Sequence, residues 1–307
     1  MADFQYNWGI TGHEKQLREL ENDLISGNIP HAYLFAGPSS IGKFSLALKL
    51  AQFLQCDRKD CNDCATCRQI AAGYHAETIV FPDDGKTISI ESIRDVLRRL
   101  STTTTATYKI FLAKNIERMT LEAANALLKT LEDPPPQVLF LLTTSHPNEL
   151  LKTILSRVRI FMFSGLPEKK LLEFLEAALP EASDDDRRLA AELSLGRPGK
   201  ALTLLRDDAL LGHYKEMYQR LCGLIDHHDM ASRFEFVAEI SKDDQFVEDF
   251  FDLFVLALRC KMLGDSSCRT HKRADIALLL GKAIHAKQLL KRNVNGRLLM
   301  ENLMLHI

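Results

Sequence analysis

The first half of the chain alternates short apolar runs with segments whose apolar residues recur at helical spacing. Five apolar runs predict strands, at residues 32–36, 77–81, 109–113, 138–144 and 159–163. A helix predicted ahead of them begins at a capping-box pair, Thr11 and Glu14, and its apolar face includes Leu17, Leu20, Leu24 and Ile25. Thr120 is the expected N-cap of a later helix. Strands that alternate with helices predict a parallel α/β sheet.

Near residues 164–167 the pattern changes, and every later periodic segment predicts a helix. Three short segments predict a small three-helix unit, at residues 167–178, 184–195 and 199–205. Five longer segments predict a helical bundle, at residues 209–225, 228–240, 243–263, 272–291 and 295–306. We therefore expect three domains: an α/β domain over residues 1–165, a three-helix domain over 166–207 and an all-α domain over 208–307.

Residues 37–45 have the pattern of a phosphate-binding loop, between a predicted strand and a predicted helix. The motif G-x-x-x-x-G-K is complete at Gly37, Gly42 and Lys43, so backbone N–H groups and the lysine could surround a phosphate. The next position should carry the Ser or Thr hydroxyl that holds Mg²⁺, and here it is Phe44. The sequence predicts a phosphate loop or a descendant of one, and it argues against magnesium-dependent hydrolysis. An ordinary glycine-rich turn is the alternative.

Four of the seven cysteines lie within twelve residues, at Cys56, Cys61, Cys64 and Cys67. Four thiolates suit a closed, tetrahedral, structural zinc site, which we define as a zinc module at residues 56–67. An iron–sulfur cluster and bare reduced thiols are the alternatives. The remaining three, Cys222, Cys260 and Cys268, are scattered and predict ordinary thiols.

The composition and net charge exclude some classes of protein. Of 307 residues, 46% are hydrophobic and 26% are charged, which is typical of a globular protein. The net charge of −2 does not favour a protein that holds nucleic acid by bulk electrostatics. No secretory signal and no run of eighteen apolar residues is present, so we expect a cytoplasmic protein with no membrane partner.

The motif N-A-L-L-K-T-L-E-D-P-P at residues 125–135 resembles clamp-loader subunits of the AAA+ class, most specifically the bacterial DNA polymerase III delta-prime subunits. Further matching stretches are I-T-G-H-E at 10–14, the phosphate loop, the inserted cysteines, T-T-S-H-P at 143–147, Ser156-Arg157 and G-R-P-G-K-A at 196–201. The resemblance covers residues 9–163 and extends into the small helical unit. It implies an AAA+ fold, a P-loop NTPase-like parallel sheet followed by a helical lid and a C-terminal collar that oligomerises.

The resemblance also implies a hetero-pentamer with motor (gamma/tau) and delta subunits, which loads the sliding clamp onto primed DNA. Each ATP of such a ring lies at a subunit boundary, where the neighbour supplies an arginine finger. Carried over to this chain, the finger is Arg157, acting in trans. A guanidinium can neutralise charge on the transferred phosphoryl group. The alternative is an ordinary surface arginine.

Three further positions depart from an active ATPase of this family. The two acidic residues expected after residues 109–113 are Lys114 and Asn115, and neither replaces a magnesium ligand and a general base. The arginine expected in the small helical unit falls at Gly199. Thr144 remains where the family has a phosphate sensor, with a strand-end hydroxyl as the equal alternative.

The resulting hypothesis is a non-hydrolysing subunit of the DNA polymerase III holoenzyme with no ATPase activity of its own. Its expected cofactors are structural Zn²⁺ and weakly bound or boundary ATP, without Mg²⁺ in its own site. One rival is an active AAA+ ATPase, which magnesium-dependent turnover by the isolated chain would establish. The other is a zinc-dependent DNA-binding repair module, which tight, salt-sensitive DNA binding would favour.

Overall fold

The computed structural model describes residues 6–58, 61, 63–102, 104, 106–226, 229–263, 273–290 and 294–307. The chain forms two compact units. The first unit comprises Met1–Phe174 with Gly196–Lys200, and the second comprises Leu175–Leu195 with Ala201–Ile307. Each unit has its own apolar core.

The first unit is built on a five-stranded, wholly parallel sheet with strand order β2-β3-β4-β1-β5. Its strands are β1 (Ala32–Ala36), β2 (Thr78–Val80), β3 (Lys109–Ala113), β4 (Val138–Thr144) and β5 (Arg159–Met162). The residues of β1, β3 and β4 are all buried, because helices cover both faces of the sheet. Ala36 pairs with Thr144 of β4 and Met162 of β5, so three strands end together beside the loop that follows β1.

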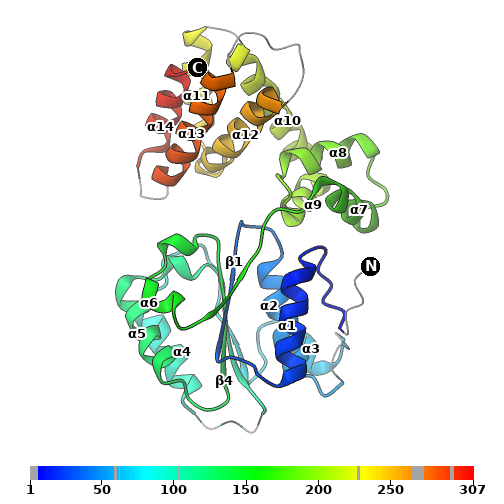
Figure 1. The fold of residues 1–307 in the computed structure, drawn as a ribbon, viewed down its shortest axis with the longest axis vertical. Coiled ribbons are helices and arrows are strands. Elements are labelled where there is room, and N and C mark those ends of the chain that lie inside the picture. The colour runs from blue at the N-terminus through cyan, green and yellow to red at the C-terminus, as the bar shows by residue number, and fades with distance from the viewer. Residues whose placement is uncertain are drawn as a thin grey trace. The chain divides into compact units, whose positions relative to one another are not determined.

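Helices of the first unit form a layer on each side of the sheet (Figure 1). One layer contains α1 (Glu14–Ser26), α2 (Lys43–Gln55) and α3 (Ala65–Ala71), and the other contains α4 (Ile90–Leu100), α5 (Leu121–Glu132) and α6 (Lys152–Leu155). Two short 3₁₀ helices, η1 (Ile116–Arg118) and η2 (Pro147–Glu149), follow β3 and β4. The sheet separates two apolar clusters, one under each helical layer.

The remaining helices are α7 (Glu168–Ala178), α8 (Asp184–Leu193), α9 (Pro198–Arg206), α10 (Asp208–Asp226), α11 (Met230–Ile240), α12 (Asp244–Leu263), α13 (Arg273–Leu290) and α14 (Gly296–Leu305). The core of the second unit is centred on α12, whose Phe250, Phe251 and Phe254 are fully buried. Among the described helices, none combines the length and apolar character that crossing a membrane requires.

The predicted α/β class and all five strands are confirmed, and each strand lies within one residue of its predicted bounds. The predicted capping box is wrong: α1 is preceded by His13 in a left-handed conformation (φ 60°), with no side-chain cap. Ile25 of the predicted apolar face is 61% exposed. Helix α3 was not predicted. The three-domain division at 165 and 207 stays a prediction, and Cys268 and residues 228, 272 and 291 lie outside the described residues.

Candidate functional site

The phosphate-loop motif lies at the carboxyl end of β1, in the turn that leads into α2. Gly37 has φ 147°, and a Cβ placed there would lie 2.3 Å from the Phe163 carbonyl oxygen, so no side chain fits. Its N–H donates to the Thr144 carbonyl at 3.2 Å, which ties the loop to β4. The turn therefore has the strand–loop–helix setting that the motif requires.

Lys43 is buried, with 6% of its surface exposed, and its ammonium is directed at its own loop. Nζ donates to the carbonyl oxygens of Gly37 and Pro38, each at 2.6 Å, and lies 3.4 Å from Ser145 Oγ. Burial lowers the pKa of Lys43 to about 8, and the nearby Glu117 carboxylate offsets part of this shift. A phosphate at this loop would have to compete with two backbone carbonyls for the lysine.

Phe44 and Lys114 contact each other beside this loop. The Lys114 Nζ lies 4.2 Å from the centroid of the Phe44 ring, in a cation–π contact. The side-chain amide of Asn115 donates to Asp83 Oδ2 at 3.4 Å, and its backbone N–H donates to Thr143 Oγ1. The ring of Phe44 and the ammonium of Lys114 offer no oxygen ligand to Mg²⁺, and Asn115 offers a neutral amide in place of a carboxylate.

Gly199 approaches the loop from the start of α9, within the first unit. Its N–H donates to the Ser40 carbonyl oxygen at 2.8 Å, and an added Cβ would lie 2.8 Å from that oxygen. The position at which the resemblance leads us to expect an arginine thus has no room for a side chain in this arrangement. A backbone hydrogen bond holds the loop instead.

Thr144 is fully buried at the end of β4. Its hydroxyl accepts a hydrogen bond from the His146 N–H at 3.0 Å, and its carbonyl accepts the one from Gly37. The hydroxyl therefore stabilises the turn after β4. The phosphate-sensor role of Thr144 stays a prediction, as do the phosphate contacts of Gly37, Gly42 and Lys43.

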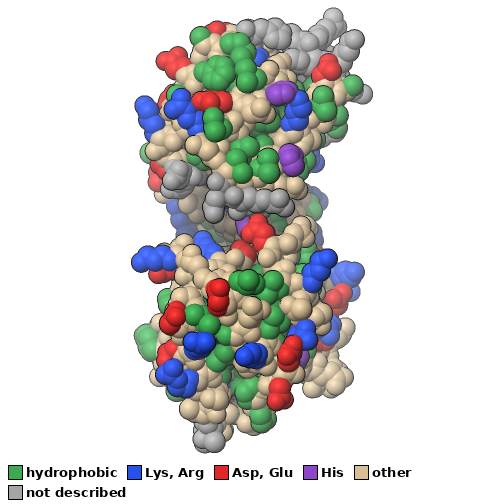
Figure 2. Space-filling view, turned by 90° about the vertical axis from the view of Figure 1, so that its left-hand side faces the viewer, with side chains coloured by type: hydrophobic (Ala, Val, Ile, Leu, Met, Phe, Trp, Pro, Cys, Tyr) green, Lys and Arg blue, Asp and Glu red, His purple; other side chains and the backbone are tan. Residues whose placement is uncertain are grey.

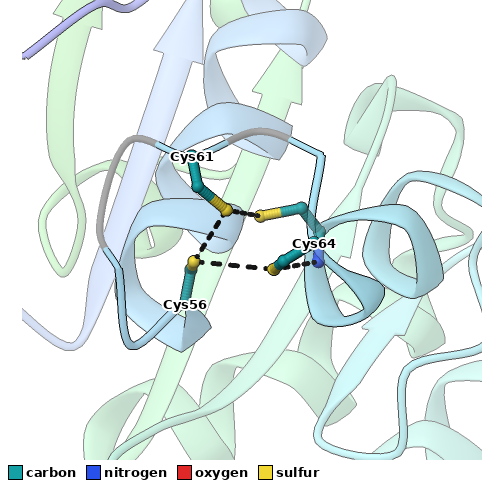
Figure 3. Close-up of side chains that lie close together, drawn as sticks. Cys56, Cys61 and Cys64 are labelled. Carbon is teal, nitrogen blue, oxygen red and sulfur yellow. Dashed lines mark hydrogen bonds between the residues drawn. The ribbon is translucent and has the colours of Figure 1, made fainter.

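The four cysteines of the predicted zinc module converge between the end of α2 and α3 (Figure 3). All four sulfur atoms lie within 4.8 Å of one another. The Cys56–Cys61, Cys56–Cys64 and Cys61–Cys67 sulfur pairs are separated by 3.3, 3.7 and 3.8 Å. Tetrahedral zinc with bonds of about 2.3 Å places its sulfur ligands roughly 3.8 Å apart. The donor set therefore fits a structural zinc ion.

Local contacts hold these sulfur atoms in place. The Cys67 N–H donates to Cys64 Sγ at 3.4 Å, and this hydrogen bond is the main cause that lowers the Cys64 pKa to about 6. Burial raises the pKa of Cys56 and of Cys67. The Gln52 side chain on α2 donates to the Cys67 carbonyl at 3.0 Å, which connects α3 to the main body of the unit. Bound zinc would hold the four sulfurs as thiolates.

Arg157 lies between α6 and β5, just after Ser156. Its Nη1 donates to the Thr153 carbonyl at 2.9 Å and to Ser156 Oγ at 3.3 Å. Its Nη2 forms an ion pair with Glu132 at the end of α5, at 2.8 Å. One third of the side-chain surface is exposed, so the guanidinium is ordered and still accessible.

Comparison with known proteins decides the family. A family model described as DNA polymerase III, delta subunit, matches residues 12–167, about half of the chain. The chain belongs to the DNA polymerase III clamp-loader subunit family.

Two curated relatives show how this clamp-loader family member compares in sequence. It is 33% identical over 210 residues to DNA polymerase III subunit delta′ of Escherichia coli, covering 66% of this chain and 61% of that one. It is 30% identical over 205 residues to DNA polymerase III subunit tau of Bacillus subtilis, covering 64% of this chain and 36% of that one. The chain thus spans about a third to three fifths of these relatives.

A solved structure shows the same fold for this clamp-loader subunit. The DNA polymerase III gamma subunit-related protein from Thermotoga maritima aligns with a TM-score of 0.52 and 20% identity. The alignment covers 95% of this chain and 98% of that chain. At this identity the likeness concerns the fold.

The structure of this clamp-loader subunit also adds residues that sequence reasoning missed. Glu132 stands within the recognised motif, but no spacing rule connects it with Arg157, 25 positions later. Glu117 and Ser145 lie beside Lys43, and Glu117 Oε1 accepts the Ser145 N–H at 2.9 Å. Glu117 follows β3 and Ser145 follows β4, and both strands end at the same edge of the sheet. The positions of these residues just after two predicted parallel strands could have indicated that they lie near the loop.

Proposed function

We propose that this chain is a non-hydrolysing clamp-loader subunit of the delta-prime type, which supplies Arg157 to an ATP site on a neighbouring subunit. One observation carries the proposal: Phe44 and Lys114 contact each other at the two positions that hold magnesium in active relatives. The chain thus combines an altered site of its own with the Ser156-Arg157 pair needed by a neighbour. Sequence identity alone does not separate the types, since delta′ and tau relatives match at 33% and 30%.

The proposed role of Arg157 follows from its charge and its exposure. A guanidinium presented at a subunit boundary can neutralise the charge that develops on the phosphoryl group transferred from the neighbour's ATP. Arg157 lies after a short helix and before the edge strand β5. That location keeps its backbone in a fixed position while one third of its side-chain surface remains exposed.

The proposed partners are motor (gamma/tau) and delta subunits in a hetero-pentamer, with the sliding clamp and primed DNA as the substrates of the whole assembly. The proposed compartment is the cytoplasm. The zinc module would stabilise the first unit, since its four sulfurs have the spacing of tetrahedral zinc. Charges of both signs are interspersed on the face seen in Figure 2, which does not favour DNA binding by bulk charge there.

The test is steady-state ATP hydrolysis by the isolated chain and by a complex reconstituted with gamma/tau, delta, clamp and primed DNA. We expect the isolated chain to be inactive and the complex with Arg157→Ala to lose turnover, since an arginine finger contributes about 10³-fold at its site. Other sites in the ring reduce the loss in the total rate. Arg18→Ala, at an exposed residue of α1, is the matched control. Turnover by the isolated chain would instead indicate an active ATPase, and an unchanged Arg157→Ala complex would reject the finger.

A further inference from the structure

The guanidinium of Arg157 is held by two segments that are distant in the sequence. Thr153 and Ser156 bind Nη1 from the adjoining turn, whereas Glu132 binds Nη2 from the end of α5. The two hydrogen bonds come from Nη1, and Nη2 forms the ion pair, so a guanidinium with five N–H donors keeps others unused. Among the described residues the guanidinium makes no other hydrogen bond, and one third of the side chain is exposed, so its unused N–H groups can reach a phosphate oxygen.

Glu132 is attached to a rigid part of the first unit. It is the last residue of α5, whose inward face is buried at Ala123, Leu127 and Leu131, with Leu131 only 1% exposed. Three prolines at 134–136 follow and prevent the helix from continuing. The Arg157 side is anchored in the same core, because Ile154 of α6 is 1% exposed. Both partners thus stand on backbone that packing holds in place.

An arginine side chain has many rotamers, and ordering it at an interface costs free energy. A partner that already holds the side chain in one orientation removes part of that cost before the interface forms. Glu132 can do so without covering the guanidinium, since Arg157 keeps one third of its side-chain surface exposed. An exposed ion pair contributes little to folding stability. We therefore attribute the Glu132–Arg157 pair to positioning of the arginine rather than to stabilisation of the fold.

We propose that Glu132 is a positioning residue that pre-orients Arg157 for the ATP site of the neighbouring subunit. The proposal rests on the function proposed above for Arg157. Glu132 itself touches neither nucleotide nor metal in this role, and it acts only through the guanidinium. Its carboxylate pairs with Nη2, while the Thr153 carbonyl and the Ser156 hydroxyl accept hydrogen bonds from Nη1. Together these contacts fix the plane of the guanidinium.

The experiment compares the ATPase kcat and KM of the reconstituted complex carrying Glu132→Gln, Glu132→Asp, Arg157→Ala or the Glu132→Gln/Arg157→Ala pair. We expect Glu132→Gln to lower kcat about two- to tenfold, the range expected for ordering one long side chain, with KM unchanged. Glu132→Asp should recover part of the loss, because it restores the charge. The double variant should match Arg157→Ala, because Glu132 acts only through the arginine.

Glu122→Gln is the matched control, since Glu122 is an exposed residue of the same helix with no ion pair among the described residues. Its complex should turn over like the parent, and thermal unfolding should show that every variant folds. A kcat that stays the same or rises in Glu132→Gln, while Arg157→Ala remains deficient, overturns the positioning role alone. An Arg157→Ala complex with normal turnover overturns both this role and the proposed function.

Discussion

The ammonium of Lys114 lies over the ring of Phe44, with 4.2 Å between Nζ and the ring centroid. In phosphate-loop ATPases the corresponding positions carry a hydroxyl and a carboxylate that together hold Mg²⁺. Here both ligands are replaced, and the two replacements interact favourably with each other. The pair therefore places a positive charge beside the residue that follows Lys43 of the phosphate loop.

Magnesium should not strengthen ATP binding by the isolated chain. A ring and an ammonium offer no oxygen ligand, and the lysine charge repels a second cation. Isothermal titration with ATP, in the presence of MgCl₂ and in the presence of EDTA, checks this prediction. Equal heats and affinities, or no binding in either buffer, are expected. A clear gain in affinity with Mg²⁺ would show that other residues complete a metal site.

Replacing Gly199 with alanine should destabilise the first unit by about 1–3 kcal/mol, the usual cost of overpacking. The new Cβ would lie 2.8 Å from the Ser40 carbonyl oxygen and 3.2 Å from Ser40 Cβ, so the loop or α9 must shift. Gly212→Ala in α10 is the control, since nothing lies within 4 Å of its added Cβ. That variant should gain about 0.5–1 kcal/mol from helix propensity. Chemical denaturation of both variants measures the difference, and equal stability would contradict the close approach at Gly199.

The burial of Lys43 should give the chain a specific dependence on alkaline pH. Its pKa is about 8 in the folded chain against 10.5 in the unfolded one, so the unfolded state binds more protons between these values. Burial of the charged lysine therefore lowers the free energy of unfolding below pH 8. The free energy of unfolding recovers as the pH rises toward 10.5, because the lysine becomes neutral. The shift corresponds to about 3 kcal/mol.

Lys43→Met removes this titration. The stability of the variant relative to the parent should therefore fall by about 3 kcal/mol between pH 7.5 and pH 10.5. Urea denaturation across that range measures the difference. Lys15→Met, at an exposed residue of α1, is the control and should show a flat difference. A flat difference for Lys43→Met as well would mean that the ammonium is solvated or well paired.

The purified chain should contain a single tightly bound zinc ion. Cys61→Ser removes one thiolate and should lower both the zinc content and the stability of the first unit, because binding free energy of a structural metal is also folding free energy. Metal analysis by mass spectrometry and thermal unfolding with and without a chelator check this. Cys222→Ser, outside the module, should retain the metal. Iron with visible absorption in place of zinc would identify a cluster instead.

The local sequence pattern determined the strands, one helix start and the cysteine cluster of this protein. Apolar runs set the five strands, and Thr120 begins α5 as expected, with its hydroxyl accepting the Ala123 N–H at 3.1 Å. The four cysteines of the zinc module lie within twelve residues, so the short chain between them keeps their side chains close together. Their sulfur atoms accordingly converge in the structure. Local rules failed at the start of α1, where His13 adopts a left-handed conformation that no capping pattern signals.

Which of the residues that depart from the family pattern contact each other depends on the tertiary fold. Phe44 and Lys114 are 70 positions apart, and Glu132 and Arg157 are 25 apart, so their contacts depend on strand order and helix packing. The sequence alone showed that magnesium ligands were missing, but not that the replacements pair or that Gly199 binds Ser40. Side-chain periodicity reports which face of an element is buried, whereas the partner across the interface is set by how the elements pack.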